Sequence, residues 1–310
     1  MQNQFSRTQL LMGKAAIDTL MGSRVAVFGV GGVGGYVVEA LARSGVGELD
    51  IIDDDRVCLT NVNRQVIATL STVGKHKVDV CEERVHDINR RCIVHKYQMF
   101  YLPETADAID ISQFDYVVDC IDTVKAKLDL IKRCHDQKVP IISCMGAANK
   151  MDATAFQVTD INKTKMDPLA KVIRKKLRKM NIHKLKVVYS EEEPLRPIDD
   201  PNIRCRFHCI CPNKDMRKCT DRRDIPASNA FVPAAAGLIC GGEVIKDLVR
   251  IAGTWRLTPE MIAENPETKA AAEKAAAKAE AHQEKYKAIA LAKKNGTWED
   301  DTVRMALPFD

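Results

Sequence analysis

The feature that most constrains the fold is a glycine cluster that directly follows an apolar run. The run RVAVFGV covers residues 24–30, and the cluster GVGGVGG covers 29–35. A helix-like segment then ends at Gly45, and the apolar segment ELDIIDDD, over 48–55, ends in acids. This order predicts a strand, a tight turn, a helix and a second strand, which together make a βαβ unit.

The alternation of strands and helices continues to about residue 148. A short amphipathic helix is expected before the first strand, over 8–21. Beyond the βαβ unit the sequence predicts helices at 73–92 and 124–139 and strands at 93–100, 114–122 and 140–148. Alternation of this kind favours an α/β fold, with a Rossmann-like, mostly parallel sheet covered by helices on both faces.

The pattern changes after about residue 160. Between 163 and 186 the chain carries ten Lys or Arg and one acid, with apolar residues at helical spacing, which predicts a basic amphipathic helix. This helix lies in a basic insertion of about 161–230, within a domain that we place at 1–255. The remainder, 256–310, is rich in Ala, Lys and Glu but has almost no apolar stripe, so we expect a weakly docked or solvent-exposed helical tail.

The composition excludes several classes of protein. Hydrophobic residues make up 45% and charged residues 29%, and no apolar run approaches the roughly 18 residues that a membrane span needs. The polar N-terminus argues against a signal peptide, so we expect a cytoplasmic protein without membrane contact. Eleven cysteines in such a chain indicate reduced thiols, metal ligands or core packing rather than a disulfide framework.

The glycine cluster predicts a nucleotide site. Without side chains, Gly29, Gly31, Gly32 and Gly34 allow a tight turn and let backbone N–H groups approach phosphate oxygens at a helix N-terminus. Asp53 ends the next strand, where an acid would bind a ribose hydroxyl. These residues alone leave open whether the ligand is a nicotinamide dinucleotide or another nucleotide.

The following segments favour a nucleoside triphosphate. Cationic and amide side chains follow the ribose acid, and further acids end a later strand; the set is Asp55, Asn61, Asn63, Arg64, Gln65, Lys75, Lys77, Asp119 and Asp122. Substitution at phosphorus needs cations for the leaving pyrophosphate and usually Mg²⁺, whereas a nicotinamide enzyme needs little positive charge. Together these side chains therefore predict a triphosphate site in preference to an NAD site.

The segments GVGGVGG, IIDDD, NVNRQ, VGKHK and VVDCID resemble, in order and spacing, the ThiF/MoeB/ubiquitin-activating superfamily over about residues 5–160. The resemblance implies adenylation of a carboxylate by ATP, with Mg²⁺. By the same resemblance Arg64 and Lys77 would hold phosphates and Asp122 would position Mg²⁺. Arg7 matches an arginine that reaches the partner subunit's site, which implies a homodimer. Gly35 departs from the Ser common in the family, so a capping hydroxyl is lost.

Later segments resemble one branch of this superfamily. Carrier-protein members often hold zinc through two CxxC pairs, and no CxxC occurs here. The segments MDPLAKVIRKKLRK, KVVYSEEEPLRP and FVPAAAGLICGGEVIKDL resemble the tRNA threonylcarbamoyladenosine dehydratase branch, to about residue 250. That branch implies ATP-dependent dehydration, with cyclisation, of N6-threonylcarbamoyladenosine in tRNA through an acyl-adenylate, without an enzyme thioester. A sulfur-transfer partner is left open.

A polyanionic substrate agrees with the basic helix. Six of its cations are candidates for tRNA binding: Lys171, Arg174, Lys175, Lys176, Arg178 and Lys179. Such a row supplies sequence-independent attraction to phosphates that salt weakens. The alternative is an ordinary solvated helix face.

The cysteine-rich segment leaves three interpretations. Cys205, Cys209, Cys211 and Cys219 lie within fifteen residues, and four thiols could hold Zn²⁺, although the usual CxxC knuckle is missing. A reduced structural loop and a redox-sensitive loop are the alternatives.

For the whole chain, three hypotheses compete with the dehydratase. They are an adenylyltransferase for a small sulfur-carrier protein, a non-catalytic nucleotide- or RNA-binding protein, and a nicotinamide enzyme.

Overall fold

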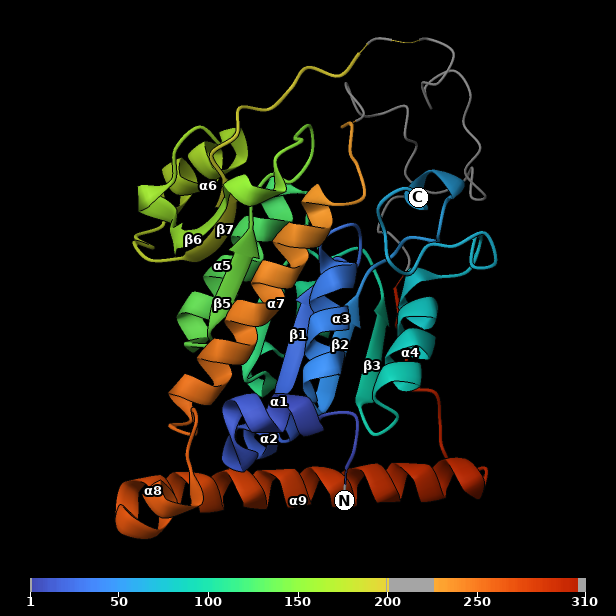
Figure 1. Ribbon diagram of the computed structural model, residues 1–310. Helices are drawn as coiled ribbons and strands as arrows, with labels where there is room; N and C mark the ends of the chain where they lie inside the picture. The colour runs from blue at the N-terminus through green and yellow to red at the C-terminus, as the bar shows by residue number, and fades with distance from the viewer. Residues whose placement is uncertain (1, 199, 201–225, 306–310) are drawn as a thin grey trace.

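A twisted sheet forms the centre of the molecule (Figure 1). The structure is a computed structural model and describes residues 2–198, 200 and 226–305. Within these residues the sheet has eight strands in the order β6-β7-β5-β4-β1-β2-β3-β8, and the β6–β7 pair is antiparallel while the others are parallel. The strands are β1 Arg24–Phe28, β2 Glu48–Ile52, β3 Ile93–Gln98, β4 Tyr116–Asp119, β5 Ile141–Cys144, β6 Phe156–Asp160, β7 Lys186–Ser190 and β8 Val303–Arg304.

Helices cover both faces of this sheet, as the alternation predicted. One face carries α3 (Gly34–Ser44), α4 (Lys77–Ile88) and α7 (Val232–Ile251), and the other carries α5 (Val124–Gln137) and α6 (Pro168–Lys179). Strand β1 shows why both faces must be covered: Val25 and Val27 pack on the α3 side, and Ala26 and Phe28 pack on the α5 side. A strand that is apolar on both faces is stable only between two layers.

Helix ends follow the local sequence. Gly45 ends α3 in the left-handed conformation at φ 91°, which a residue with a Cβ rarely adopts. Asp167 caps α6 by accepting a hydrogen bond from the Ala170 N–H at 2.8 Å, and Pro168 begins the helix. The basic helix therefore lies within the segment predicted for it, 163–186, and begins at Pro168.

The N-terminal segment forms two helices instead of the single helix expected. Helix α1 covers Ser6–Met12 and α2 covers Lys14–Met21. Gly13 separates them at φ 92°, and a Cβ at this position would lie 2.9 Å from the carbonyl oxygen of Leu257. Helical periodicity continues across Gly13 in the sequence, so the break depends on a backbone contact with a distant segment.

The tail is helical and mostly exposed, as expected, but it docks on the rest of the molecule along one edge. Helix α8 (Pro259–Glu264) leads into α9 (Pro266–Lys294), which runs along the amino-terminal edge of the sheet against α2 (Figure 1). Ala275 and Ala279 are buried, and a Cβ on Gly22 would lie 2.6 Å from that of Lys278. Small side chains on both helices permit this close approach, so a broad apolar stripe is unnecessary.

Polar contacts add to this docking. Lys285 Nζ lies 2.7 Å from the Glu48 carboxylate, and His282 lies 3.1 Å from the Arg91 carbonyl oxygen. Strand β8 then pairs with β3. In the described part of the chain no helix has the length and apolar character to cross a membrane.

Candidate active site

The glycine turn lies where β1 ends, and its geometry excludes side chains. Gly29 has φ 85°, and a Cβ there would lie 2.9 Å from the Cys120 carbonyl oxygen. A Cβ on Gly34 would lie only 1.8 Å from the Gly29 carbonyl oxygen. No described side chain caps the start of α3, although the Gly35 and Tyr36 N–H groups donate to the Gly31 and Val33 carbonyl oxygens at 3.1 and 3.0 Å. An anion at this helix N-terminus would therefore meet the backbone of the glycine turn itself, over 31–34.

Two side chains from the segment after β2 line this turn. A Cβ on Gly32 would lie 3.5 Å from Arg64 Cγ, and one on Gly31 would lie 3.8 Å from Gln65 Nε2. Gln65 is only 7% exposed, and its Oε1 has no hydrogen-bond partner among the described residues. Gln65 Oε1 is thus a buried hydrogen-bond acceptor without a described partner, and it lies beside the glycine turn. This arrangement fits a ligand that carries hydroxyl or amino donors, as a nucleotide does.

Asp53 organises the end of β2. Its carboxylate accepts the Val30 N–H at 2.8 Å and the Asp55 N–H at 2.9 Å, which ties β2 to the glycine turn. Lys77, at the start of α4 and only 4% exposed, places its Nζ 2.7 Å from Asp55 Oδ2 and 3.4 Å from Asp53 Oδ1. The structure therefore brings the predicted ribose acid and a predicted phosphate cation together.

Burial dominates the electrostatics of this cluster. Burial raises the pKa of Asp53, and the positive charge of Lys77 acts in the opposite direction and lowers it. Burial, Asp55 and Asp53 raise the pKa of Asp54 to about 7. Burial alone would lower the pKa of Lys77, but Asp53 and Asp55 outweigh it and raise that pKa above its usual value. Lys77 is therefore a permanent cation at this edge of the sheet.

Asn61 and Asn63 shape the loop that carries Arg64. Asn61 accepts the Cys58 N–H at 3.0 Å, and Asn63 donates to the Ser228 carbonyl oxygen at 3.1 Å. Arg64 in turn donates to the side-chain oxygen of Asn63 at 2.9 Å. Both amides have contacts within the protein, and their direct contact with a cofactor stays a prediction.

Asp122 lies just beyond the end of β4, exposed, with the Thr123 hydroxyl 3.3 Å from its carboxylate. The position is the carboxyl edge of the sheet, shared with the glycine turn and Asp53. The sequence reasoning missed Lys127 and Ser143, which are fully buried around Asp119 behind this loop. A lysine within an otherwise apolar helix stripe, four residues after the helix cap, is the signal that could have found Lys127.

Arg7 lies away from these residues. It is exposed on α1, which lies with α2 and α9 at the amino-terminal edge, whereas the glycine turn is at the carboxyl edge (Figure 1). Within one chain the structure therefore does not bring Arg7 to the nucleotide residues. Leu10 and Leu11 on the same helix are 88% and 63% exposed.

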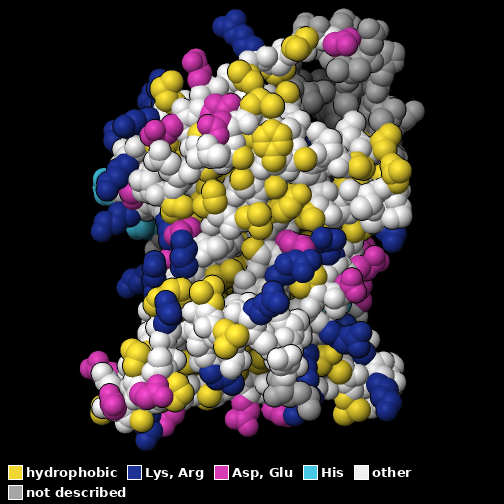
Figure 2. Space-filling view, viewed as in Figure 1, with side chains coloured by type: hydrophobic (Ala, Val, Ile, Leu, Met, Phe, Trp, Pro, Cys, Tyr) yellow, Lys and Arg dark blue, Asp and Glu magenta, His cyan; other side chains and the backbone are white. Residues whose placement is uncertain are grey.

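The basic helix α6 presents most of its predicted cations to solvent. Lys171, Lys175, Lys176 and Lys179 are exposed and form no ion pair with a described residue. In Figure 2, Lys and Arg side chains gather along the left margin, where α6 lies in Figure 1. The predicted row of cations is therefore present on the surface.

Arg174 and Arg178 differ from the four lysines. Arg174 donates to the Thr164 hydroxyl and carbonyl oxygens at 2.5 and 2.9 Å, so it fastens the start of the basic insertion. Arg178 is exposed and lies 3.3 Å from the Asn162 side chain. Arg174 thus has a structural role that the charge pattern did not show.

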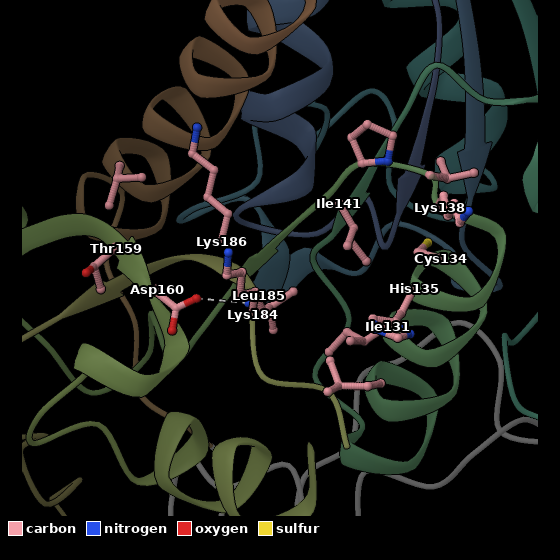
Figure 3. Close-up of a pocket in the computed structure, with 14 residues that line it drawn as sticks. Ile131, Cys134, His135, Lys138, Ile141, Thr159, Asp160, Lys184, Leu185 and Lys186 are labelled. Atoms are coloured by element: carbon pink, nitrogen blue, oxygen red, sulfur yellow. Dashed lines mark hydrogen bonds between the residues drawn. The ribbon is translucent and has the colours of Figure 1, made fainter. Parts of the chain in front are cut away.

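A groove of about 610 Å³ opens between the carboxyl end of α5 and the amino ends of β5 and β7 (Figure 3). On one wall, Asp160 accepts the Leu185 N–H at 3.2 Å. Lys138 and Lys184 also line the groove; both are exposed and form no ion pair with a described residue. The groove contains none of the predicted nucleotide residues, and it adds two cations that the sequence reasoning did not select.

The cysteines divide into two groups. Cys134 and Cys144 are buried in the core, and Cys120 packs against it, as predicted. The predicted zinc candidates Cys205, Cys209, Cys211 and Cys219 lie outside the described residues. Zinc binding therefore stays a prediction.

Known proteins resemble the chain over most of its length. A curated tRNA threonylcarbamoyladenosine dehydratase of Bacillus subtilis is 48% identical over 251 residues, which are 81% of this chain and 96% of that protein. Solved structures of Escherichia coli TcdA, a tRNA N6-threonylcarbamoyladenosine dehydratase, superimpose with TM-scores of 0.70 for the AMP complex and 0.67 for the ATP complex. They are 31% and 30% identical to this chain, and each match covers 81% of it and 95% of the solved chain.

A more distant group is also similar. The molybdopterin-synthase adenylyltransferase of Escherichia coli is 34% identical over 145 residues, 46% of this chain and 57% of that protein. The model of the ThiF family matches residues 5–291. The chain therefore belongs to the ThiF family.

Proposed function

We propose that this protein is an ATP-dependent tRNA threonylcarbamoyladenosine dehydratase. The observation that carries the proposal is the glycine turn: neither Gly29 nor Gly34 can accept a Cβ, and the N-terminus of α3 behind them has no side-chain cap among the described residues. The turn occurs in a chain that is 48% identical to a tRNA threonylcarbamoyladenosine dehydratase, over 81% of this chain and 96% of that protein. A glycine turn at a helix N-terminus, with Arg64 and Lys77 near it, suits a triphosphate.

The side chains suggest how the carboxylate would be activated. A carboxylate oxygen of the substrate attacks the α-phosphorus of ATP, pyrophosphate leaves, and an acyl-adenylate forms. A nucleophile in the same modified side chain then attacks the acyl carbon, AMP leaves, and the ring closes with net loss of water. Arg64 and Lys77 would stabilise charge on the phosphates, and Asp53 would orient the ribose.

The residues present also fit a magnesium ion. Asp122 supplies an exposed carboxylate oxygen at the carboxyl edge of the sheet, and hard oxygen ligands are those that Mg²⁺ prefers. When bound there, Mg²⁺ would neutralise charge on the phosphates. Asp122 is our candidate ligand.

We assign the tRNA-binding surface to α6. Lys171, Lys175, Lys176 and Lys179 offer exposed cations to phosphates, and Arg178 is exposed beside them. Replacing Lys175 and Lys179 by Gln should weaken tRNA binding at 0.1 M salt and reduce the slope of log K against log[salt] by about 2. Lys269→Gln with Lys274→Gln, on the exposed face of α9, is the matched control, and equal losses in the two pairs would contradict the assignment.

A homodimer would explain the position of Arg7. Arg7 is exposed at the edge of the sheet opposite the nucleotide residues, so a role in nucleotide binding would place it in the site of another copy. Mixing Arg7→Ala with Asp122→Asn, each inactive alone, should restore about a quarter of wild-type activity per chain if equal amounts exchange freely into dimers. Absence of any recovery in mixtures shown to exchange would contradict action across subunits.

The decisive assay measures the nucleoside itself. The protein is incubated with ATP, Mg²⁺ and threonylcarbamoyl-modified tRNA, and mass spectrometry is used to detect loss of one water. Asp122→Asn should abolish the loss, whereas Asp136→Asn, an exposed acid on α5, should not. An unchanged nucleoside with wild-type protein would refute the proposed function, and full activity of Asp122→Asn would support a role that does not require this acid.

A pyrophosphate-exchange assay tests the second candidate function. Similarity to the molybdopterin-synthase adenylyltransferase favours a carrier-protein substrate as the alternative. Pyrophosphate exchange that a small Gly-Gly carrier protein stimulates, and that modified tRNA does not, would support it. Cytoplasmic location, zinc at the four cysteines and a sulfur-transfer partner remain predictions from the sequence.

A further inference from the structure

A buried ion pair lies directly behind the loop that carries Asp122. Lys127 Nζ lies 2.9 Å from Asp119 Oδ2, and the Ser143 hydroxyl donates to the same oxygen at 2.5 Å. All three residues are 0% exposed. They come from three elements, the end of β4, the adjacent strand β5 and the first turns of α5. We call this group the Asp119 clasp.

The Asp119 clasp closes the loop at both ends. Asp119 Oδ1 accepts the Ile121 N–H at 3.1 Å, so the carboxylate holds the loop backbone from within. At the other end the Lys127 N–H donates to the Thr123 carbonyl oxygen at 3.0 Å, while the Lys127 side chain returns to Asp119. The residues between, 120–122, are thereby fixed from both ends.

The same loop forms one wall of the glycine turn. The Cys120 carbonyl oxygen would lie 2.9 Å from a Cβ on Gly29, and Cys120 Cβ would lie 3.3 Å from one on Gly34. The Cys120 N–H also donates to the Phe28 carbonyl oxygen at 2.9 Å. A shift of this loop would therefore change the distance between the phosphate cradle and Asp122.

Energetics argue against a merely stabilising role for the Asp119 clasp. Removing two charges from water costs several kcal/mol per ion, and apolar replacements of whole buried ion pairs are often neutral or stabilising by about 1–4 kcal/mol. An apolar cluster would fill the same space between β4, β5 and α5. An apolar cluster, however, cannot fix a specific backbone N–H group and two side chains through their contacts with one carboxylate.

We propose that Lys127 and Ser143 are positioning residues that act through Asp119 to set the spacing between Asp122 and the glycine turn, and hence the affinity for ATP with Mg²⁺. The inference rests on the proposed function, because it needs a nucleotide between these two elements. None of the three clasp residues contacts the nucleotide, since all are enclosed.

The test compares stability with nucleotide affinity in the same variants. The apolar variant carries Asp119→Val, Ser143→Ala and Lys127→Met together, and Lys125→Met, an exposed lysine on the same helix, is the matched control. Urea unfolding gives stability, and calorimetry gives the Kd of ATP with Mg²⁺ and with EDTA. We expect the apolar variant to keep its unfolding midpoint but to bind ATP with Mg²⁺ about 10–100-fold more weakly, as for lost outer-shell partners. With EDTA in place of Mg²⁺, the loss of affinity for ATP should be small.

Two results would overturn the inference. One is wild-type affinity for ATP with Mg²⁺ in the folded apolar variant. The other is an equal loss with Mg²⁺ and with EDTA, which would indicate general damage to the cradle. If the apolar variant does not fold, the single variant Ser143→Ala takes its place, because it keeps the ion pair of Lys127 with Asp119. An unchanged Kd for ATP with Mg²⁺ in this variant would refute the positioning role. Wild-type protein that binds no ATP would refute the proposed function, and the inference with it.

Discussion

Replacing Lys77 by Met should destabilise the protein in a way that depends on pH. Lys77 is the cation for a cluster of three consecutive aspartates and is 4% exposed. Removing one partner of a buried ion pair costs about 3–5 kcal/mol because the other charge is left unpaired. The Asp55 carboxylate is exposed and can regain water, so we place the loss at the lower end, about 3 kcal/mol at pH 8.

The sign of the pH dependence follows from the pKa values of the aspartates. Burial raises the pKa of Asp53, and burial with neighbouring charge raises that of Asp54 to about 7. A carboxyl with a raised pKa in the folded protein binds its proton more tightly there than in the unfolded chain, so stability falls as pH rises from about 4 to 7. Without Lys77 these pKa values rise further. The deficit of Lys77→Met should therefore be greatest above pH 7 and shrink toward pH 5.

Urea unfolding at pH 8 and pH 5.5 measures both quantities, with Lys75→Met as the control. Lys75 is half exposed, and its contact with Glu83 is 3.6 Å long, so its removal should change stability by less than about 0.5 kcal/mol. A deficit for Lys77→Met that is the same at the two pH values would refute the electrostatic reasoning. So would a deficit no larger than that of Lys75→Met.

Three further substitutions test other contacts. Asp54→Asn should raise stability at pH 8 by about 2–4 kcal/mol and change little at pH 4, because it removes a carboxyl whose pKa is about 7; urea unfolding at both pH values checks this. Gly34→Ala should abolish ATP binding in calorimetry, whereas Gly242→Ala, where a Cβ meets nothing within 4 Å, should be neutral or stabilising by up to about 1 kcal/mol. Ala279→Glu should lower the thermal midpoint by placing a charge between α9 and α2, while Ala276→Glu on the exposed face should not.

Local sequence patterns predicted strands β1 to β5 because most of them are short apolar runs beside a helix. These strands and helices α3 to α6 occur where alternation and helix signals place them. The misses share a physical cause. The break at Gly13 and the docking of α9 both depend on close backbone approach between segments far apart in the chain, which periodicity does not encode. Strand β8 has two residues and depends wholly on pairing with β3.

The site could be predicted from the sequence where its polar side chains directly follow the ends of predicted strands. Asp53 and the glycines are brought together as predicted, and Lys77 joins them from the next helix. Lys127 and Ser143 were missed because a buried lysine contradicts the usual preference of charged side chains for the surface. The positioning role that we propose for them follows only from their distances to Asp119.

Two of the buried lysines, Lys77 and Lys127, show one arrangement used twice, with different outcomes. In each case an aspartate ends a parallel strand, accepts N–H groups of the loop that follows, and pairs with a lysine near the start of the next helix: Asp53 with Lys77, and Asp119 with Lys127. A lysine at a helix N-terminus is disfavoured by the helix dipole, so each lysine depends on its strand-end acid. The pairs differ in enclosure. Lys127 is sealed at 0% exposure, whereas Lys77 also contacts Asp55, whose side chain is 63% exposed. In the proposed site the sealed pair would position the loop, whereas the open pair would exchange a carboxylate for a phosphate. By this proposal the same local arrangement supplies both the rigid wall and the phosphate-binding edge of the site.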